Sequence, residues 1–317
     1  MFNIAQEILK GNPRAIARGI SLIENKHPDA QKILKTLFSH TGESIIIGIT
    51  GSPGSGKSTL VDQLIGSFSE KKKNIGIIAV DPSSPFSGGA ILGDRIRMMR
   101  HSSDPNVYIR SMATRGHLGG LARATGEAIS ILEASGKDVI IVETVGVGQD
   151  EVEVVKLADI VIVVLIAGVG DDIQAFKAGI MEIADIFVLN KADSPESDRT
   201  ESQIKAMLDL GLSKEKIPPV VKTIATVGEG IDSLIEEIEI LSHTQDQKVR
   251  MTRKKRLLSW ILKDIIAEKI HQVISEHIQS EEFESFVDRI YKKEIDPYSL
   301  AQKIVDKIKK DSDDQDN

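Results

Sequence analysis

Hydrophobic residues follow three patterns along the chain, and each predicts a different kind of structure. Near the N-terminus they recur three or four positions apart, as at Ile16, Ile20 and Ile23, which is the spacing of one helix face. A middle region alternates short apolar runs with helical patterns, and the last part is again helical. The predicted parts are an N-terminal helical extension at 1–43, an α/β domain at 44–245, a C-terminal helical arm at 246–310 and an acidic disordered tail at 311–317.

The apolar runs of the middle region predict strands. They consist mostly of valine and isoleucine without regular polar alternation, which indicates strands covered by helices on both faces. Such strands form parallel sheets, so we expect a doubly wound α/β domain with a mostly parallel sheet. The predicted strands are 45–50, 74–80, 138–143, 160–166, 185–189 and 220–224.

Composition and charge narrow the class of protein. With 317 residues, 41% of them hydrophobic and 27% charged, the chain resembles an ordinary soluble protein. The net charge of −7 disfavours a nucleic-acid or anionic-membrane surface, and the lack of cysteine excludes disulfides and thiolate metal sites. The longest apolar stretch, 160–170, is too short to cross a bilayer, and the first residues lack the profile of a secretion signal. We therefore expect a cytoplasmic enzyme or switch without nucleic-acid or membrane-inserted partners.

A phosphate-binding motif follows the first predicted strand. The sequence from Gly51 to Ser58 fits G-x-x-x-x-G-K-[S/T], and a helical pattern begins directly behind it. Glycines let the backbone N–H groups surround phosphates at the positive end of that helix, Lys57 would reach the outer phosphates, and the Ser58 hydroxyl would bind Mg²⁺. The strand and helix on either side disfavour a mere surface turn. The residues expected to bind the phosphates are Gly51, Ser52, Pro53, Gly54, Ser55, Gly56, Lys57, Ser58 and Thr59.

A second motif predicts which base is bound. Asn190, Lys191 and Asp193 form N-K-x-D just past a predicted strand, where ligands of open α/β sheets bind. The Asp193 carboxylate can accept from the ring N–H and the exocyclic amine of guanine, whereas adenine presents an acceptor at the ring position. Lys191 would lie along the base, and Asn190 would tie this loop to the phosphate loop. The alternative is a helix-entry turn with solvated charges.

A third loop is expected to complete the base site. The Ser-Ala pair that GTPases usually carry after the last strand is here Ile224-Ala225, so only backbone contacts to the base oxygen are expected. These would come from the stretch Ala225, Thr226 and Val227. The nucleotide is thus expected to be GTP or GDP, and the fold a P-loop NTPase G domain flanked by two helical extensions.

Carboxylates at strand ends predict a magnesium site around Ser58. Asp81 and Glu143 end the second and third predicted strands, and Asp94 follows a loop rich in serine and glycine. These oxygens can hold Mg²⁺ and its waters, directly or through water. The alternative for Asp81 is a cap on the turn before Pro82, and for Asp94 a cap on a helix.

The sequence also predicts slow unaided hydrolysis. Val147 occupies the position where Ras-like proteins have a water-orienting glutamine. The missing group must then come from elsewhere, and Gln174 and Lys177 are candidates because their loop follows a strand. The expected catalytic set is Lys57, Glu143, Gln174 and Lys177. A plain connection with capping aspartates remains the alternative for the loop, and the segment with Arg115 and His117 is either a switch, a partner surface or a glycine-rich helix entry.

Several long strings run through the chain, among them ITGSPGSGKSTL, VDPSSPFSGGAILGDRIRM, IRSMATRGHLGGLA, ETVGVGQ, DDIQAFKAGI and EIADIFVLNKAD. Together they resemble the MeaB family of methylmalonyl-CoA mutase-associated GTPases, also labelled ArgK-type proteins. The similarity runs from Ala15 to Ala301. It implies a G domain of the dimerising class found in signal-recognition GTPases and MinD, with a C-terminal dimerisation arm.

The same resemblance implies a partner and residue roles. Family members bind an adenosylcobalamin-dependent acyl-CoA mutase, gate its cofactor loading and protect it from inactivation by using GTP hydrolysis. The positions matching Ser58, Asp81, Asp94 and Glu143 serve the magnesium site, and the loop from Gly170 to Lys177 responds to the mutase. The chain would act as a homodimer. An apolar stripe from Leu257 to Ile274 independently predicts a partner helix, in the same chain or in a second subunit.

Three other functions stay open at this point. The ArgK label suggests an ATPase or kinase linked to amino-acid transport, but N-K-x-D disfavours ATP. A metal-insertion GTPase for nickel enzymes should carry Cys/His clusters, whereas this chain has no cysteine and seven scattered histidines. Nucleotide binding without catalysis is disfavoured because Lys57, Ser58 and the carboxylates are all present.

Overall fold

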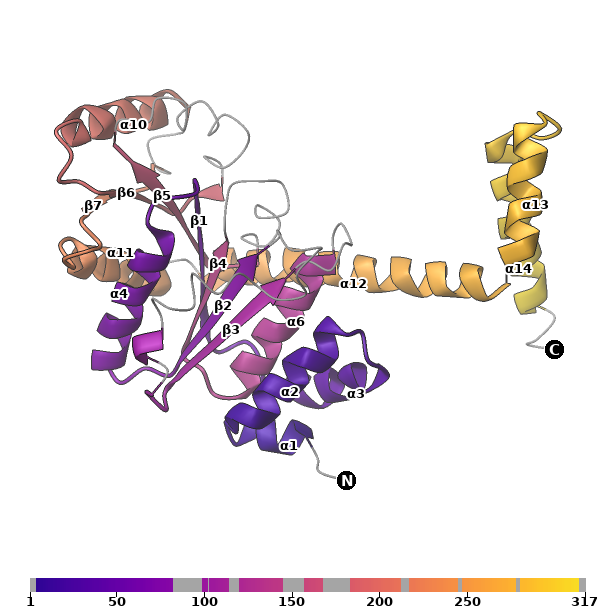
Figure 1. Ribbon diagram of the computed structural model, residues 1–317, viewed down its shortest axis with the longest axis horizontal. Coiled ribbons are helices and arrows are strands. Elements are labelled where there is room, and N and C mark those ends of the chain that lie inside the picture. Colours follow the sequence, from indigo (N-terminus) through magenta and orange to yellow (C-terminus); the bar gives the residue numbers. More distant parts are fainter. Residues whose placement is uncertain are drawn as a thin grey trace. The chain divides into compact units, whose positions relative to one another are not determined.

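The computed structural model describes residues 4–81, 99–101, 103–113, 120–144, 157–167, 183–211, 217–244, 247–277 and 280–313. The chain forms two compact units, Met1–Arg253 and Lys254–Asn317. The first contains a β-sheet with helices around it, and the second consists of helices (Figure 1).

The described strands form one sheet in the order β3-β2-β4-β1-β5-β6-β7, and every neighbouring pair is parallel. This confirms the predicted doubly wound α/β fold. The order reverses at β1, so the crevice at the carboxyl end of β1 is the position where such folds bind ligands. The strands are β1 (Ile45–Gly51), β2 (Ile75–Asp81), β3 (Val107–Ala113), β4 (Val139–Thr144), β5 (Ile160–Ile166), β6 (Ile186–Asn190) and β7 (Val220–Thr223).

One strand, β3, was missed by the sequence prediction, whereas the other six lie within one residue of their predicted bounds. Among the described strands β3 lies at the edge of the sheet and pairs with β2 alone, so it has no need of a continuous apolar run. Its apolar run is interrupted by the polar residues Arg110 and Ser111, while Val107 and Ile109 pack against the core. A search for unbroken Val/Ile runs therefore passes over it.

Helices cover both faces of the sheet. On one face, Leu60 of α4 and Ile235 of α11 share a hydrophobic cluster with Ile77 of β2. On the other face, Leu132 of α6 lies so close to Gly76 that a β-carbon there would meet it at 2.9 Å. Successive residues of a strand point to opposite faces of the sheet. Because helices cover both faces, successive residues of these strands are apolar. The helices of this unit are α1 (Ile4–Leu9), α2 (Pro13–Glu24), α3 (Pro28–Leu37), α4 (Lys57–Glu70), α6 (Gly120–Ala134), α10 (Ser197–Gly211) and α11 (Ile231–Thr244), with short 3₁₀ turns η1 (Phe38–His40) and η2 (Met99–His101).

The N-terminal extension folds as helices, as predicted, and packs against the sheet domain. α2 and α3 lie on α6 (Figure 1), and the breaks between the helices fall at Asn12-Pro13 and His27-Pro28. Arg110 of β3 forms an ion pair with Glu24 at the end of α2 and donates to Ser21 Oγ at 3.1 Å. The edge strand is thereby fixed to the extension.

The C-terminal part is helical, with α12 (Gln247–His277), α13 (Ser280–Tyr291) and α14 (Pro297–Asp313). α14 continues three residues past the predicted boundary at 310, and 314–317 lie outside the described residues. The predicted stripe on α12 is exposed within this chain, at Leu258, Leu262, Ile266, Ile270 and Val273. Within the described ranges, none of the helices has the length and hydropathy needed to cross a membrane.

Candidate nucleotide-binding site

The loop between β1 and α4 has a backbone that only glycine allows at two positions. Gly51 has φ +146°, and a β-carbon there would lie 2.2 Å from the carbonyl oxygen of Val164 in β5. Gly56, the residue before α4, has φ +92°, and a β-carbon there would lie 2.3 Å from Asn190 Nδ2. Glycine is therefore required both for the left-handed backbone and for the close approach of β5 and β6. This is the strand, loop and helix arrangement that the motif predicted.

Lys57 is the first residue of α4, and its side chain folds back across the loop. Although charged, it is buried, and Nζ donates to the carbonyl oxygens of Gly51 at 2.7 Å and Ser52 at 2.9 Å. The ammonium group thus lies within the loop, beside the positive end of the α4 dipole. Such an arrangement attracts the phosphates of a nucleotide.

Ser58 and Glu143 lie in direct contact. Ser58 Oγ donates to Glu143 Oε1 at 2.6 Å, and Glu143 is buried. In the sheet register Glu143 of β4 lies between Ile49 of β1 and Ala79 of β2, close to the carboxyl ends of all three strands. A hydroxyl and a carboxylate oxygen are ligands that Mg²⁺ accepts, so the residues present fit the predicted metal.

The predicted metal site also includes Asp81 and Asp94. The backbone of Asp81 ends β2, the strand next to β4, and Asp94 lies outside the described residues. Within the described part of the chain no three His, Asp or Glu side chains gather in a way that could hold a metal ion. Gln174, Lys177 and Val147, with Arg115 and His117, also fall outside the described ranges.

Asn190 connects the three loops of the site. Its Nδ2 donates to the carbonyl oxygen of Ser55 in the phosphate loop at 2.8 Å. Its Oδ1 accepts from Thr223 Oγ1 and from the Ala225 N–H, both at 3.1 Å. The residue is buried, so each of these bonds forms away from water and is costly to lose. The tie to the phosphate loop that the sequence predicted is present.

Lys191 and Asp193 follow on the exposed side of the same loop. Lys191 adopts φ +57°, and its Nζ donates to the carbonyl oxygen of Gly54 at 3.0 Å. The Ala192 N–H donates to the Thr223 carbonyl oxygen at 3.1 Å, and the Asp193 side chain is exposed. The carboxylate is accessible to a base that lies beside the phosphate loop.

The loop after β7 is held in place by its own backbone. Ile224 and Glu229 form an antiparallel bridge, and the Val227 N–H donates to the Ile224 carbonyl oxygen at 3.0 Å. Gly230 closes the loop with φ +78°, where a β-carbon would lie 2.0 Å from the Lys222 carbonyl oxygen. The Ala225 N–H is engaged by Asn190, and Thr226 is exposed. Contact of this loop with the base oxygen stays a prediction.

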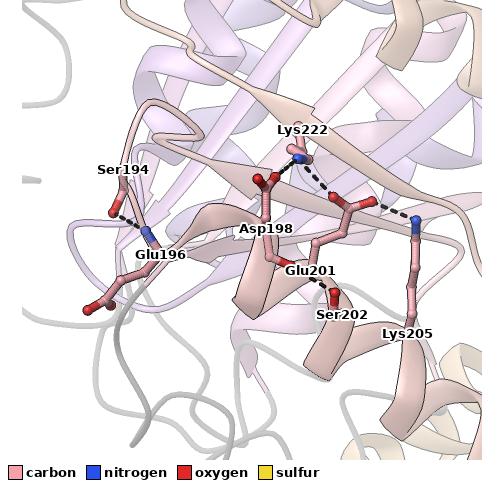
Figure 2. Close-up of polar contacts among 7 residues, drawn as sticks. All are labelled: Ser194, Glu196, Asp198, Glu201, Ser202, Lys205 and Lys222. Atoms are coloured by element: carbon pink, nitrogen blue, oxygen red, sulfur yellow. Dashed lines mark hydrogen bonds and ion pairs between the residues drawn. The ribbon is translucent and has the colours of Figure 1, made fainter.

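Sequence reasoning missed an ion network that supports the base loops (Figure 2). Lys222 of β7 contacts Asp198 Oδ1 at 2.6 Å and Glu201 Oε2 at 2.9 Å, and Lys205 contacts Glu201 at 2.6 Å. These bonds fix the first turns of α10 to β7. The hydrogen bonds that Lys205 and then Lys222 donate to Glu201 lower the pKa of its carboxyl, and the bonds that Lys222 donates to Asp198 and then Glu201 raise the pKa of Lys222. From the sequence alone, only the ion pair between Glu201 and Lys205 could have been predicted, because these residues are four positions apart on a helix.

Fold and site together define a P-loop GTPase. A family model described as "Methylmalonyl Co-A mutase-associated GTPase MeaB" matches residues 16–279, and the chain belongs to this family. A Pyrococcus horikoshii protein that is named as a GTPase is 48% identical to this chain over 314 residues. The match covers 96% of this chain and 97% of the relative. GTPase ArgK of Escherichia coli is 33% identical over 282 residues, covering 85% of each protein.

A solved structure extends the comparison to the fold. The structure titled "Crystal structure of LAO/AO transport system kinase" superposes with a TM-score of 0.68 at 24% identity, covering 96% of each chain. At this identity the likeness concerns the fold. It spans nearly the full length, helical extensions included.

Proposed function

We propose that this GTPase assists and protects an adenosylcobalamin-dependent acyl-CoA mutase of the methylmalonyl-CoA mutase type and gates the loading of its cofactor. The observation that supports this most is the match of residues 16–279 to a family described as mutase-associated. The match includes the whole sheet domain and reaches past α12.

The described contacts support specific roles at the nucleotide. GTP or GDP binds with its phosphates in the loop from Gly51 to Thr59 and its base beside Asp193, between Lys191 and the loop Ala225 to Val227. Lys57 neutralises charge on the outer phosphates, because its ammonium group already lies inside the loop. Discrimination against ATP rests on the exposed carboxylate of Asp193.

Magnesium is proposed to lie at the contact between Ser58 and Glu143. Ser58 Oγ and Glu143 Oε1 meet at 2.6 Å in a partly buried position. The neighbouring strand β2 ends at Asp81. When bound, the ion would neutralise the β- and γ-phosphates. Asp94 completes the set, with direct or water-mediated ligation.

Hydrolysis is proposed to depend on the mutase. Gln174 and Lys177 supply the group that Val147 does not provide, and they do so when the partner is bound. The protein works in the cytoplasm as a homodimer, with the exposed stripe of α12 contributing to subunit contact. No nucleic acid is a partner, in keeping with the net charge of −7.

Mutase inactivation during turnover tests the proposal. Methylmalonyl-CoA mutase or isobutyryl-CoA mutase is incubated with its substrate, with this chain and GTP, and the surviving activity is followed over time. The proposal expects slower inactivation than without the chain, and no protection by a Lys57→Met variant. Equal decay with and without the chain for both mutases would contradict it. Gln174→Ala and Lys177→Ala should lower GTP hydrolysis only when mutase is present.

A further inference from the structure

Buried polar residues gather at the carboxyl ends of the strands around the phosphate loop. Asn190 holds the base loops together, and Glu143 contacts Ser58. Two fully buried threonines remain, Thr50 near the end of β1 and Thr144 at the end of β4. All other positions of these two strands except Glu143 are isoleucine, valine or glycine, so the threonines call for an explanation.

The two threonine hydroxyls contact each other. Thr144 Oγ1 donates to Thr50 Oγ1 at 3.1 Å and lies 3.4 Å from the carbonyl oxygen of Ile49. The backbone pairing of β1 with β4 reaches as far as Ile49 opposite Glu143. The hydroxyl contact therefore continues the connection between the two strands by one residue. A hydroxyl that is shielded from water needs such a partner, and the bond fixes its direction as well as its distance.

The threonine contact lies directly beside the contact between Glu143 and Ser58. Thr50 is the residue before Gly51, with which the phosphate loop begins. Thr144 is the residue after Glu143, whose Oε1 accepts from Ser58 Oγ at 2.6 Å. The carboxyl end of β4 is thus tied at two successive residues, by Thr144 to the start of the phosphate loop and by Glu143 to the helix behind it.

Packing alone does not require these hydroxyls. Valine has nearly the shape of threonine, is favoured in strands and needs no hydrogen-bond partner when it is buried. Replacing both partners of a buried hydrogen bond by apolar groups of the same shape can be nearly neutral for stability. The hydroxyl pair therefore indicates that the end of β4 has to be held in one position relative to the phosphate loop.

We propose that Thr144 is a positioning residue for Glu143: through its bond to Thr50 it keeps the Glu143 carboxylate at the Ser58 hydroxyl. The inference rests on the role proposed above for Glu143 at the magnesium ion. Without the bond, the end of β4 is free to move relative to the phosphate loop, so the chain should bind Mg²⁺ less tightly and hydrolyse GTP more slowly. GDP binding without Mg²⁺ should not change, because the glycines and Lys57 of the phosphate loop stay in place.

Titration of Mg²⁺ into the complex of the full chain with GDP measures magnesium binding apart from activity. Thr144→Val should weaken magnesium binding about tenfold or more, as the loss of a group that holds a metal ligand typically does, and should lower kcat for GTP by a similar factor. GDP affinity in EDTA should equal that of wild type. Thr144→Ser keeps the hydroxyl and should restore both properties. Thr50→Val should act like Thr144→Val, and the double variant should match the single ones because all three remove one contact.

Ser44→Ala is the matched control, since it removes a buried hydroxyl at the opposite end of the same two strands. Ser44 precedes β1, and its Oγ donates to the carbonyl oxygen of Lys137, shortly before β4 begins. The variant should lower the urea midpoint as Thr144→Val does, because each loses a buried hydrogen bond. It should keep magnesium binding and kcat at the wild-type values, because the carboxyl end of β4 is not affected.

The outcomes separate the inference from the proposed role of Glu143. Normal magnesium binding and kcat in Thr144→Val, with both reduced in Glu143→Gln, would overturn the inference alone, and so would equal losses in Ser44→Ala. Normal magnesium binding and kcat in Glu143→Gln would overturn the proposed role of Glu143 and the inference with it. If Thr144→Val fails to fold, Thr50→Val breaks the same contact from β1 and gives the result.

Discussion

The Ser58 hydroxyl donates to the Glu143 carboxylate at 2.6 Å, although the two residues are 85 positions apart in the sequence. Ser58 is the second residue of the helix behind the phosphate loop, and Glu143 is the next-to-last residue of strand β4. The sheet order brings them together, because β4 is the immediate neighbour of β1. This pair joins the helix behind the phosphate loop to strand β4, at the place where we propose the magnesium site.

Glu143→Gln tests the pair. The amide keeps the shape but removes the charge that Mg²⁺ requires, so GTP hydrolysis at limiting Mg²⁺ should fall about 10- to 100-fold. GDP binding in EDTA should be unchanged, because the phosphate loop does not depend on the carboxylate charge. Glu236→Gln, an exposed position on α11, serves as control. Full hydrolysis by Glu143→Gln at limiting Mg²⁺ would remove Glu143 from the metal site.

Gly56→Ala tests the approach of the phosphate loop to Asn190. The added β-carbon would lie 2.3 Å from Asn190 Nδ2 and would also occupy a left-handed backbone, so both GDP affinity and stability should fall. Gly136→Ala is the matched control, since Gly136 has φ +83° and no atom within 4 Å of the added carbon. It should lose about 1 kcal/mol of unfolding free energy from backbone strain alone, with normal GDP affinity. Calorimetric GDP titration and urea unfolding measure the two effects. Equal GDP affinity in the two variants would contradict the argument.

Asp193→Asn tests the base preference. An amide presents a donor where the carboxylate accepted, so guanine loses a partner, whereas xanthine offers a carbonyl at the position of the exocyclic amine. Competition binding should show GDP weakened by about 100-fold or more and xanthosine diphosphate strengthened. Asp209→Asn, exposed on α10, should leave both affinities unchanged. An undiminished preference for GDP in Asp193→Asn would place the base elsewhere.

Glu201→Gln tests the ion network that Glu201 forms with Lys222 and Lys205. The pKa of Glu201 is lowered in the folded state from its ordinary value of 4.5, so the unfolded chain binds the proton more readily. Its stabilising effect is then present above about pH 4.5 and is lost as the pH falls through the lowered value. Urea midpoints measured from pH 7 to pH 3 should decline less steeply for Glu201→Gln than for wild type. Parallel declines would show that the network adds nothing to the pH dependence.

The sequence predicted the parts of this molecule whose physical cause is local. The sequence from Gly51 to Ser58 predicts the phosphate-binding loop because glycine, lysine and serine each have a required position in that motif. Six strands were predicted from continuous apolar runs, because a strand covered by helices on both faces needs apolar residues at successive positions. β3 was not predicted because Arg110 and Ser111 interrupt its apolar run, which an edge strand allows. The ion pairs of Lys222 were not predicted because its partners Asp198 and Glu201 lie more than twenty positions away in the sequence, and single charged residues on a helix resemble solvated ones.

The most direct test of the account is the steady-state rate of GTP hydrolysis with and without an adenosylcobalamin-dependent acyl-CoA mutase, measured alongside ATP. We predict slow hydrolysis of GTP by the chain alone, a rate that rises with mutase concentration to saturation, and negligible hydrolysis of ATP under both conditions. A GTP rate that no such mutase changes, or an ATP rate equal to it, would contradict the account.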